Sequence, residues 1–197
     1  MTAIPTMSAN SAEAVVIGAS AGALEALSVI LPALPAEYRL PVIIVVHIPP
    51  DKRSVLVELF QAKCAVKVEE AEDKIAIRDG TAYFAPPDYH LLIERDKSLS
   101  LSSDEPVLFS RPSIDVLFES AADAYGPALI GVLLTGASQD GAHGMKAIVE
   151  SGGMAIVQDP HSAFAPAMPE AAIAACPGAL VLSLQDIATY LGSVQRQ

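Results

Sequence analysis

Cysteine is scarce in this chain of 197 residues, and its scarcity limits the kinds of fold that the sequence can form. The two cysteines, Cys64 and Cys176, lie far apart and form no C-x-x-C pair. Disulfide frameworks and structural zinc sites need several cysteines at close, regular spacing. We therefore expect two buried thiols in a reducing cytosol, and we find no metal-ligand spacing elsewhere in the sequence.

Basic residues are also few. Lys and Arg number 12 against 23 Asp and Glu, which gives a formal net charge of −11. Nucleic-acid binders obtain much of their affinity from cationic contacts to phosphates, and anionic membrane surfaces attract basic segments. The charge balance therefore argues against both kinds of partner.

Long apolar runs are missing as well. No stretch approaches the about 18 apolar residues that favour a membrane span. The first residues, MTAIPTMSANSAEA, contain no basic residue and no apolar core of a signal peptide. We expect a cytoplasmic protein with a disordered tail over residues 1–12 and one globular domain over residues 13–197.

What is present is an alternation of strands and helices. Hydrophobic residues make up 52% of the chain, and β-branched runs typical of strands buried on both faces alternate with segments of helical periodicity. This pattern predicts an α/β fold: a doubly wound, mostly parallel sheet in a three-layer sandwich. The expected strands are 14–17, 41–46, 128–134, 154–158 and 179–182, and the expected helices are 23–27, 54–62, 114–124, 142–151, 170–175 and 185–191.

Residues 65–103 have a different pattern. Short strands at 66–69 and 81–85 precede two segments, 90–94 and 98–102, that flank a turn and predict a hairpin. We expect this region to be an antiparallel insertion or edge of the sheet, with His90 on the hairpin.

The turn after the first strand has the spacing G-x-S-x-G, from Gly18 to Gly22. A strand that passes through a tight glycine turn into a helix exposes one side chain at the turn, here Ser20. This is the arrangement of a nucleophile elbow, in which the serine lies near the N–H groups of the helix N-terminus. Dinucleotide-binding domains open in a similar way. They need a glycine at position 20 and an acidic residue at the end of the second strand, where His47 stands instead.

Two more polar residues follow predicted strands. His47 ends the second strand, and Asp140 lies in the turn after strand 128–134. Ligands of open α/β sheets bind at the carboxyl ends of the strands, so Ser20, His47 and Asp140 can meet as nucleophile, base and base partner. The simpler interpretations are a structural histidine and an aspartate that forms a turn or caps a helix. Ser113 is a candidate N-cap of helix 114–124, with Asp115 in its first turn.

Several blocks in this order resemble the catalytic domain of the CheB family of chemotaxis protein-glutamate methylesterases. They are VVIGASAG (15–22), VVHIP (45–49), YFAP (83–86) with HLL (90–92), RPSIDVLF (111–118), LTGASQDG (134–141) and MP (168–169) with AAI (171–173). The resemblance implies a serine hydrolase without a cofactor, which releases methanol from glutamate methyl esters on the cytoplasmic helices of chemoreceptors. Many members also deamidate receptor glutamines.

The resemblance also implies roles for particular residues. Ser20, His47 and Asp140 would be the catalytic residues, Ala21 and Ala137 would form the oxyanion site, and Arg111 would hold the site or bind the receptor. The family usually reads G-A-S-T-G-G and T-G-M-G-x-D-G, so Ala21, Ala23, Ala137 and Ser138 depart from it. A backbone N–H donor survives a change to alanine.

The departures motivate a second hypothesis, a weak or inactive CheB-like binding module in a signalling complex. A nucleotide-dependent enzyme is a distant third. Typical family members carry an N-terminal receiver domain, for which the residues before the first strand are too few. We therefore expect any regulation to come from a partner or a separate regulatory protein.

Overall fold

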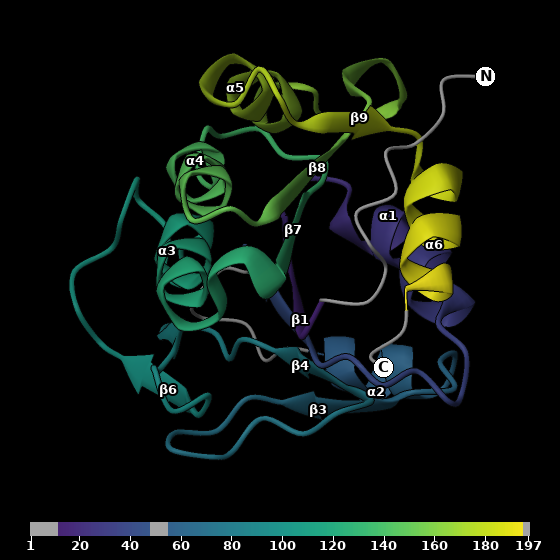
Figure 1. The fold of residues 1–197 in the computed structure, drawn as a ribbon, viewed down its shortest axis with the longest axis vertical. Helices are drawn as coiled ribbons and strands as arrows, with labels where there is room; N and C mark the ends of the chain where they lie inside the picture. The colour runs from purple at the N-terminus through teal and green to yellow at the C-terminus, as the bar shows by residue number, and fades with distance from the viewer. Residues whose placement is uncertain (1–11, 48–54, 195–197) are drawn as a thin grey trace.

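A seven-stranded parallel sheet forms the centre of the molecule, in the order β3-β4-β2-β1-β7-β8-β9 (Figure 1). The structure is a computed structural model that describes residues 12–47 and 55–194. The strands of this sheet are β1 (Ala14–Ala19), β2 (Val42–Val46), β3 (Lys67–Glu70), β4 (Thr81–Phe84), β7 (Leu129–Leu133), β8 (Met154–Gln158) and β9 (Leu180–Leu182).

Helices cover both faces of the sheet and complete three layers (Figure 1). One face packs against α1 (Ala23–Ile30), α2 (Leu56–Gln61) and α6 (Leu184–Ser193). The other packs against α3 (Ile114–Tyr125), α4 (Ala142–Glu150) and α5 (Ala167–Ala175). The short 3-10 helices are η1 (Leu31–Ala33), η2 (Gly126–Ala128) and η3 (Pro160–Ser162).

Strand β1 lies at the centre of the sheet and contributes to both cores. Val15 and Ile17 point into the core under α1 and α6, whereas Ala14 and Val16 point into the core under α3 and α4. Successive side chains of a strand alternate between its faces, so a strand covered on both sides must be apolar throughout. This explains the continuous β-branched run that predicted the strand.

Strands β3 and β4 correct part of the prediction for residues 65–103. They pair in parallel with each other, and β4 also pairs in parallel with β2, so both extend the main sheet. The antiparallel element is the hairpin of β5 (His90–Ile93) and β6 (Leu99–Ser102), as expected. A separate hairpin beside a mostly parallel sheet agrees with the predicted fold class.

The structure can also be compared with the predictions for the N-terminal tail and for the two cysteines. Residues 1–11 of the expected tail lie outside the described residues, and Ala12 is buried in the core under α1. Cys176 is buried as expected, but Cys64 is half-buried, and both are free thiols. No helix in the described part of the chain has the length and apolarity to cross a membrane.

Candidate active site

Ser20 occupies a sharp turn between β1 and α1. Its N–H donates to Thr135 O (2.9 Å), and its carbonyl accepts from the N–H of Ala23 (2.9 Å). Gly22 has a φ of +86°, and a Cβ at this position would lie 2.6 Å from the Cβ of Phe164. A side chain there is therefore disfavoured both by the backbone conformation and by space. The second glycine of G-x-S-x-G is thus required by the turn itself.

His47 leaves the sheet beside Ser20. Ala19 pairs with Val46 across β1 and β2, and the His47 N–H donates to Ala19 O (3.2 Å). The next residue along each strand is therefore Ser20 on β1 and His47 on β2. This confirms that the two side chains emerge from adjacent strand ends at the carboxyl edge of the sheet.

Asp140 contacts the imidazole of His47. The distance from His47 Nε2 to Asp140 Oδ2 is 2.8 Å; the histidine side chain is 15% exposed and the aspartate is fully buried. Hydrogen bonds also reach Asp140 from the start of α3. Its Oδ1 accepts from Ser113 Oγ (2.8 Å) and Asp115 N (3.0 Å), and its Oδ2 accepts from Ile114 N (2.8 Å). The carboxylate is therefore surrounded by donors.

These donors determine the ionisation of Asp140. Burial alone would raise the pKa of this carboxyl. The hydrogen bonds from His47 and from the first turn of α3 outweigh that effect and hold its pKa below the ordinary value. Asp140 is thus a buried carboxylate whose contact with Nε2 fixes the orientation of the His47 imidazole.

Asp115 lies in the first turn of α3 and is also buried at the start of a neighbouring helix, α4. Its Oδ1 accepts from Gly141 N (2.9 Å) and Gly144 N (2.7 Å), which belong to the start of α4. Burial, with a contribution from the negative charge of Asp140, raises the pKa of Asp115 to about 6. The two aspartates therefore lie side by side with pKa values shifted in opposite directions.

The N-terminus of α3 differs from the prediction made for it. Ser113 is the N-cap residue by position, but its side chain accepts no capping bond. Its hydroxyl donates to Asp140 instead, and Asp140 accepts the N–H groups that an N-cap oxygen usually satisfies. The cap of α3 thus comes from a residue distant in sequence, which no local pattern could show.

His90 is a further residue whose role sequence reasoning missed. It lies on β5 as expected but is buried, with Nδ1 accepting from Ser113 N (3.1 Å) and Nε2 on Glu105 O (3.1 Å). It thereby fixes the residue that donates to Asp140. Its sequence signals are its place at the start of a predicted strand and its place in the block HLL (90–92) of the family resemblance.

Two buried polar residues, Thr135 and Gln158, fix the Ser20 turn. Thr135 Oγ donates to Ala21 O (2.8 Å) and accepts from Ala165 N (2.9 Å). Gln158 Oε1 accepts from Thr135 N (2.9 Å). Both follow or end apolar strands, and a polar residue at the end of a buried strand is the signal that could have indicated them.

Comparison with known proteins gives the family. A family model described as "CheB methylesterase" matches residues 15–191. The chain belongs to the CheB methylesterase family. In keeping with this, the crystal structure of the Thermotoga maritima CheB methylesterase catalytic domain superimposes with a TM-score of 0.87 and 31% sequence identity, covering 92% of this chain and 97% of that chain. The two structures share one fold.

Relatives within the CheB family include both short and long chains. A Leptospira interrogans protein, provisionally named protein-glutamate methylesterase/protein-glutamine glutaminase, is 51% identical over 176 residues, covering 89% of this chain and 91% of the relative. The protein of that name from Trichodesmium erythraeum is 41% identical, covering 80% of this chain but only 46% of its own. This chain thus spans about half the length of the longer relative.

The other CheB-type site residues proposed from the sequence lie at the same edge or near it. Ala21 follows Ser20, and its carbonyl accepts from Thr135 Oγ. Ala137 is exposed in the loop between β7 and Asp140. Arg111 lies two residues before Ser113, where Nε and Nη2 bind Asp88 Oδ1 and Nη1 binds the carbonyls of Ser103 and Asp104. These bonds tie the segment before α3 to the loop before β5.

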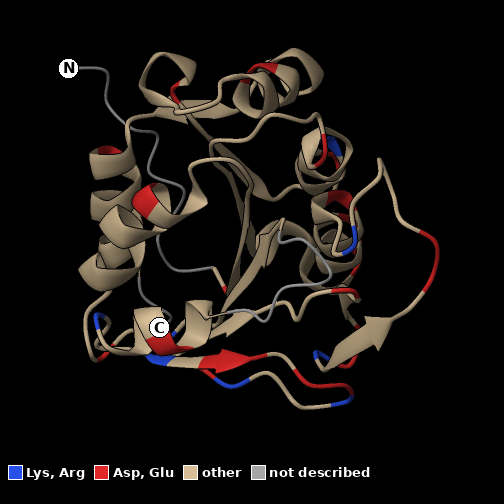
Figure 2. Cartoon of the chain, turned by 180° about the vertical axis from the view of Figure 1, so that it is seen from behind, with Lys and Arg blue, Asp and Glu red and all other residues tan. Residues whose placement is uncertain are grey.

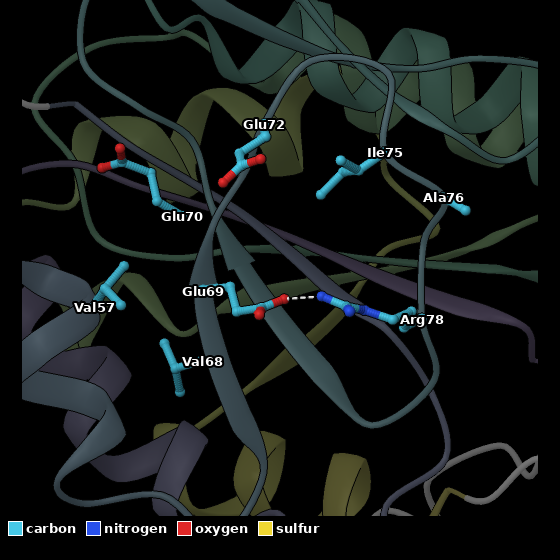
Figure 3. Close-up of a pocket in the computed structure, with 8 residues that line it drawn as sticks. All are labelled: Val57, Val68, Glu69, Glu70, Glu72, Ile75, Ala76 and Arg78. Atoms are coloured by element: carbon cyan, nitrogen blue, oxygen red, sulfur yellow. Dashed lines mark hydrogen bonds and ion pairs between the residues drawn. The ribbon is translucent and has the colours of Figure 1, made fainter.

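A separate concave region lies along β3, the outermost strand on one side of the sheet (Figure 3). It has a volume of about 640 Å³ and includes Glu69, which forms an ion pair with Arg78. Acidic residues are frequent along β3 and the loop after it (Figure 2). None of the residues around this hollow is a predicted site residue.

Across residues 12–47 and 55–194, no group of three or more His, Cys, Asp or Glu is placed to hold a metal ion.

Proposed function

We propose that this chain hydrolyses methyl esters of glutamate side chains on the cytoplasmic helices of chemoreceptors. The observation that carries the proposal is the 2.8 Å contact between His47 and Asp140 at the strand end next to Ser20. The names of its relatives support the same activity and add a protein-glutamine glutaminase activity. The reaction takes place in the cytoplasm, where those helices lie.

In the first half of the proposed reaction Ser20 acts as the nucleophile. Its Oγ attacks the ester carbonyl carbon while its proton passes to His47. Because Nε2 of His47 is held by Asp140, the nitrogen that takes the proton is Nδ1. Asp140 stabilises the imidazolium that results. The tetrahedral intermediate collapses when the imidazolium protonates the leaving methoxide, and methanol departs.

In the second half water replaces the serine. His47 takes a proton from the water, whose oxygen attacks the acyl-enzyme carbonyl, and the proton then returns to Ser20 Oγ as glutamate leaves. A glutamine amide follows the same steps with ammonia as the leaving group. Neither route needs a cofactor.

The developing oxyanion needs two N–H donors. We assign them to the backbone of Ala21, at the N-terminal end of α1, and of Ala137, in the loop that leads to Asp140. Alanine provides the same N–H as the threonine and methionine usual in the family, so the departures at these positions keep the donors. Removal of one such donor costs on the order of 10²–10³ in kcat.

The partners proposed for this activity are methylated receptor helices and a separate regulatory protein. Arg111, held by Asp88 and two carbonyls, would form part of the rim that the receptor meets. The net charge of −11 slows the approach of an acidic receptor at low ionic strength, where screening is weak.

The proposal is tested by methanol release from a methylated receptor fragment. The wild-type protein is expected to release methanol catalytically, and Ser20→Ala is expected to release none while it keeps the same thermal unfolding transition. Receptor binding without turnover by the folded wild type would instead establish the alternative, an inactive CheB-like binding module. Equal turnover by wild type and Ser20→Ala would refute Ser20 as the nucleophile.

A further inference from the structure

Phe164 is a large aromatic side chain left exposed next to the Ser20 turn. It lies in the loop between η3 and α5, and 75% of its surface is accessible to solvent. Its Cβ would lie 2.6 Å from a Cβ placed on Gly22, so the residue rests directly against the turn that carries Ser20. The exposed ring of Phe164 therefore borders the Ser20 turn directly.

The loop that carries Phe164 is fixed on both sides. Before it, Ser162 O accepts from Gln158 Nε2 (3.3 Å). After it, Ala165 N donates to Thr135 Oγ (2.9 Å), and Ala165 O accepts from Gly136 N (3.0 Å). The residues that hold this loop, Gln158 and Thr135, are the ones that hold the Ser20 turn. Phe164 is therefore positioned relative to Ser20 by a shared set of hydrogen bonds.

A fixed aromatic side chain is well suited to recognition. Phe has two side-chain torsions, and a loop that is already ordered loses little further freedom when a partner covers it. The first turn of α1 adds a second exposed apolar side chain, Leu24, which is 51% exposed. Apolar surface therefore borders the Ser20 turn on two elements, α1 and the loop before α5.

We infer that Phe164 is a docking residue for the protein that carries the glutamate ester, and that it makes this chain favour esters on a folded protein over free ones. The inference rests on the proposed function. An ester on a protein surface reaches Ser20 only if the surface around it meets the loop at Phe164. The neighbours of that ester would therefore be apolar, since an apolar side chain is what a phenyl ring binds well.

Salt dependence separates this contact from the electrostatic part of binding. The chain and an acidic partner repel each other, and added salt screens that repulsion. Contact of the phenyl ring with apolar side chains is not screened. The effect of removing Phe164 should therefore persist when the ionic strength is raised.

The experiment compares two substrates that share one reacting group. One is a methylated chemoreceptor cytoplasmic fragment, and the other is N-acetylglutamate γ-methyl ester. For Phe164→Ala we expect the ratio of kcat/KM for the protein to kcat/KM for the small ester to fall about tenfold, at low and at high salt. Phe164→Leu should lower the ratio less than Phe164→Ala does. Leucine keeps a large apolar side chain and disturbs the loop less than alanine would.

The matched control is Phe109→Ala, because Phe109 is also an exposed phenylalanine, at 102%, but lies on the segment before α3. Its ratio should stay within about twofold of wild type. An unchanged ratio in both Phe164 variants, or an equal fall in Phe109→Ala, would overturn the inference while wild-type turnover still upheld the proposed function. Absence of methanol release by the wild type would overturn both.

Discussion

Asp140, just before α4, accepts hydrogen bonds from the start of α3, and Asp115, in the first turn of α3, accepts hydrogen bonds from the start of α4. Asp140 precedes α4 and accepts from the N–H groups of Ile114 and Asp115 on α3, while Asp115 accepts from Gly141 and Gly144 at the start of α4. This reciprocal capping joins the two helices at the edge where His47 meets Asp140. A carboxylate at a helix N-terminus is favoured by the helix dipole, so both aspartates occupy suitable positions.

The raised pKa of Asp115 predicts a pH dependence of stability. Because this pKa is about 6 in the folded protein against a reference value of 3.8, the folded state binds a proton that the unfolded state has released. The contribution of Asp115 to the free energy of unfolding is therefore full below about pH 4 and falls as the pH rises to about 6. Asp115→Asn removes this dependence and keeps an acceptor for Gly141 and Gly144.

Thermal unfolding between about pH 4 and pH 7 measures the effect. We expect the melting temperature of Asp115→Asn to rise relative to wild type as the pH increases through this window. Asp123→Asn, an exposed position on the same helix, serves as the control and should show a constant difference. A difference between Asp115→Asn and wild type that is the same at both ends of the window would contradict the account.

Replacement of Asp140 should damage both catalysis and stability. Asn in this place presents an amide NH₂ to groups that are themselves donors, and it carries no charge to stabilise the His47 imidazolium. We expect kcat to fall about 10⁴-fold and the free energy of unfolding to fall by about 3 kcal/mol. Steady-state hydrolysis and urea denaturation measure the two effects.

Asp159 provides the control for Asp140. It follows β8 at the same edge of the sheet, but it is partly exposed, and its carboxylate accepts from His161 within its own turn. Asp159→Asn should therefore change kcat by less than about twofold and stability by less than about 0.5 kcal/mol. Similar losses in both variants would show that the buried site at Asp140 has no special role.

Thr135 is expected to affect both stability and kcat because its hydrogen bonds hold the Ser20 turn. Thr135→Val keeps the shape of the side chain but leaves Ala21 O and Ala165 N without their partner. We expect a loss of about 1–3 kcal/mol in the free energy of unfolding, together with a lower kcat. Thr189→Val, which removes an exposed hydroxyl on α6, should stay within about 0.5 kcal/mol of wild type; equal losses would contradict this role.

Gly141 links Asp140 to α4, and its replacement should disturb both. Its φ is +100°, and an added Cβ would lie 2.6 Å from Leu133 Cδ1 and 2.8 Å from Ile114 Cγ2. We expect Gly141→Ala to lower the free energy of unfolding by about 2 kcal/mol and to reduce kcat by moving Asp140. Gly178→Ala is the matched control because an added Cβ there meets nothing within 4 Å. A Gly141→Ala protein as stable and active as Gly178→Ala would contradict the prediction.

The sequence predicted those parts of the fold that depend on local patterns. The β-branched run in β1 indicated a strand because it is covered on both faces, and Met154–Gln158 was predicted with the bounds it has. The edge that carries Ser20 and His47 followed from the parallel order of the strands. These features need only the periodicity of one segment or a general property of parallel sheets.

The features that the sequence did not predict depend on contacts between distant segments of the chain. Asp140 caps α3 from 26 residues away, as its hydrogen bond from Ile114 N shows. The sequence pattern predicted Ser113 as the cap because it considers only the residues next to the helix. Strand β4 is short and precedes two prolines, which favoured an insertion, yet it pairs in parallel with β2. The burial of His90 follows from the packing of the hairpin on α3. Local patterns contain no information on such pairings.

The central claim is that Ser20 is a nucleophile activated by His47, and reaction with a fluorophosphonate probe tests it most directly. We predict that the purified wild-type protein is labelled at Ser20, and that labelling is lost in Ser20→Ala and in His47→Ala while both variants stay folded. Absence of labelling in folded wild type, or labelling that survives in Ser20→Ala, would contradict the account.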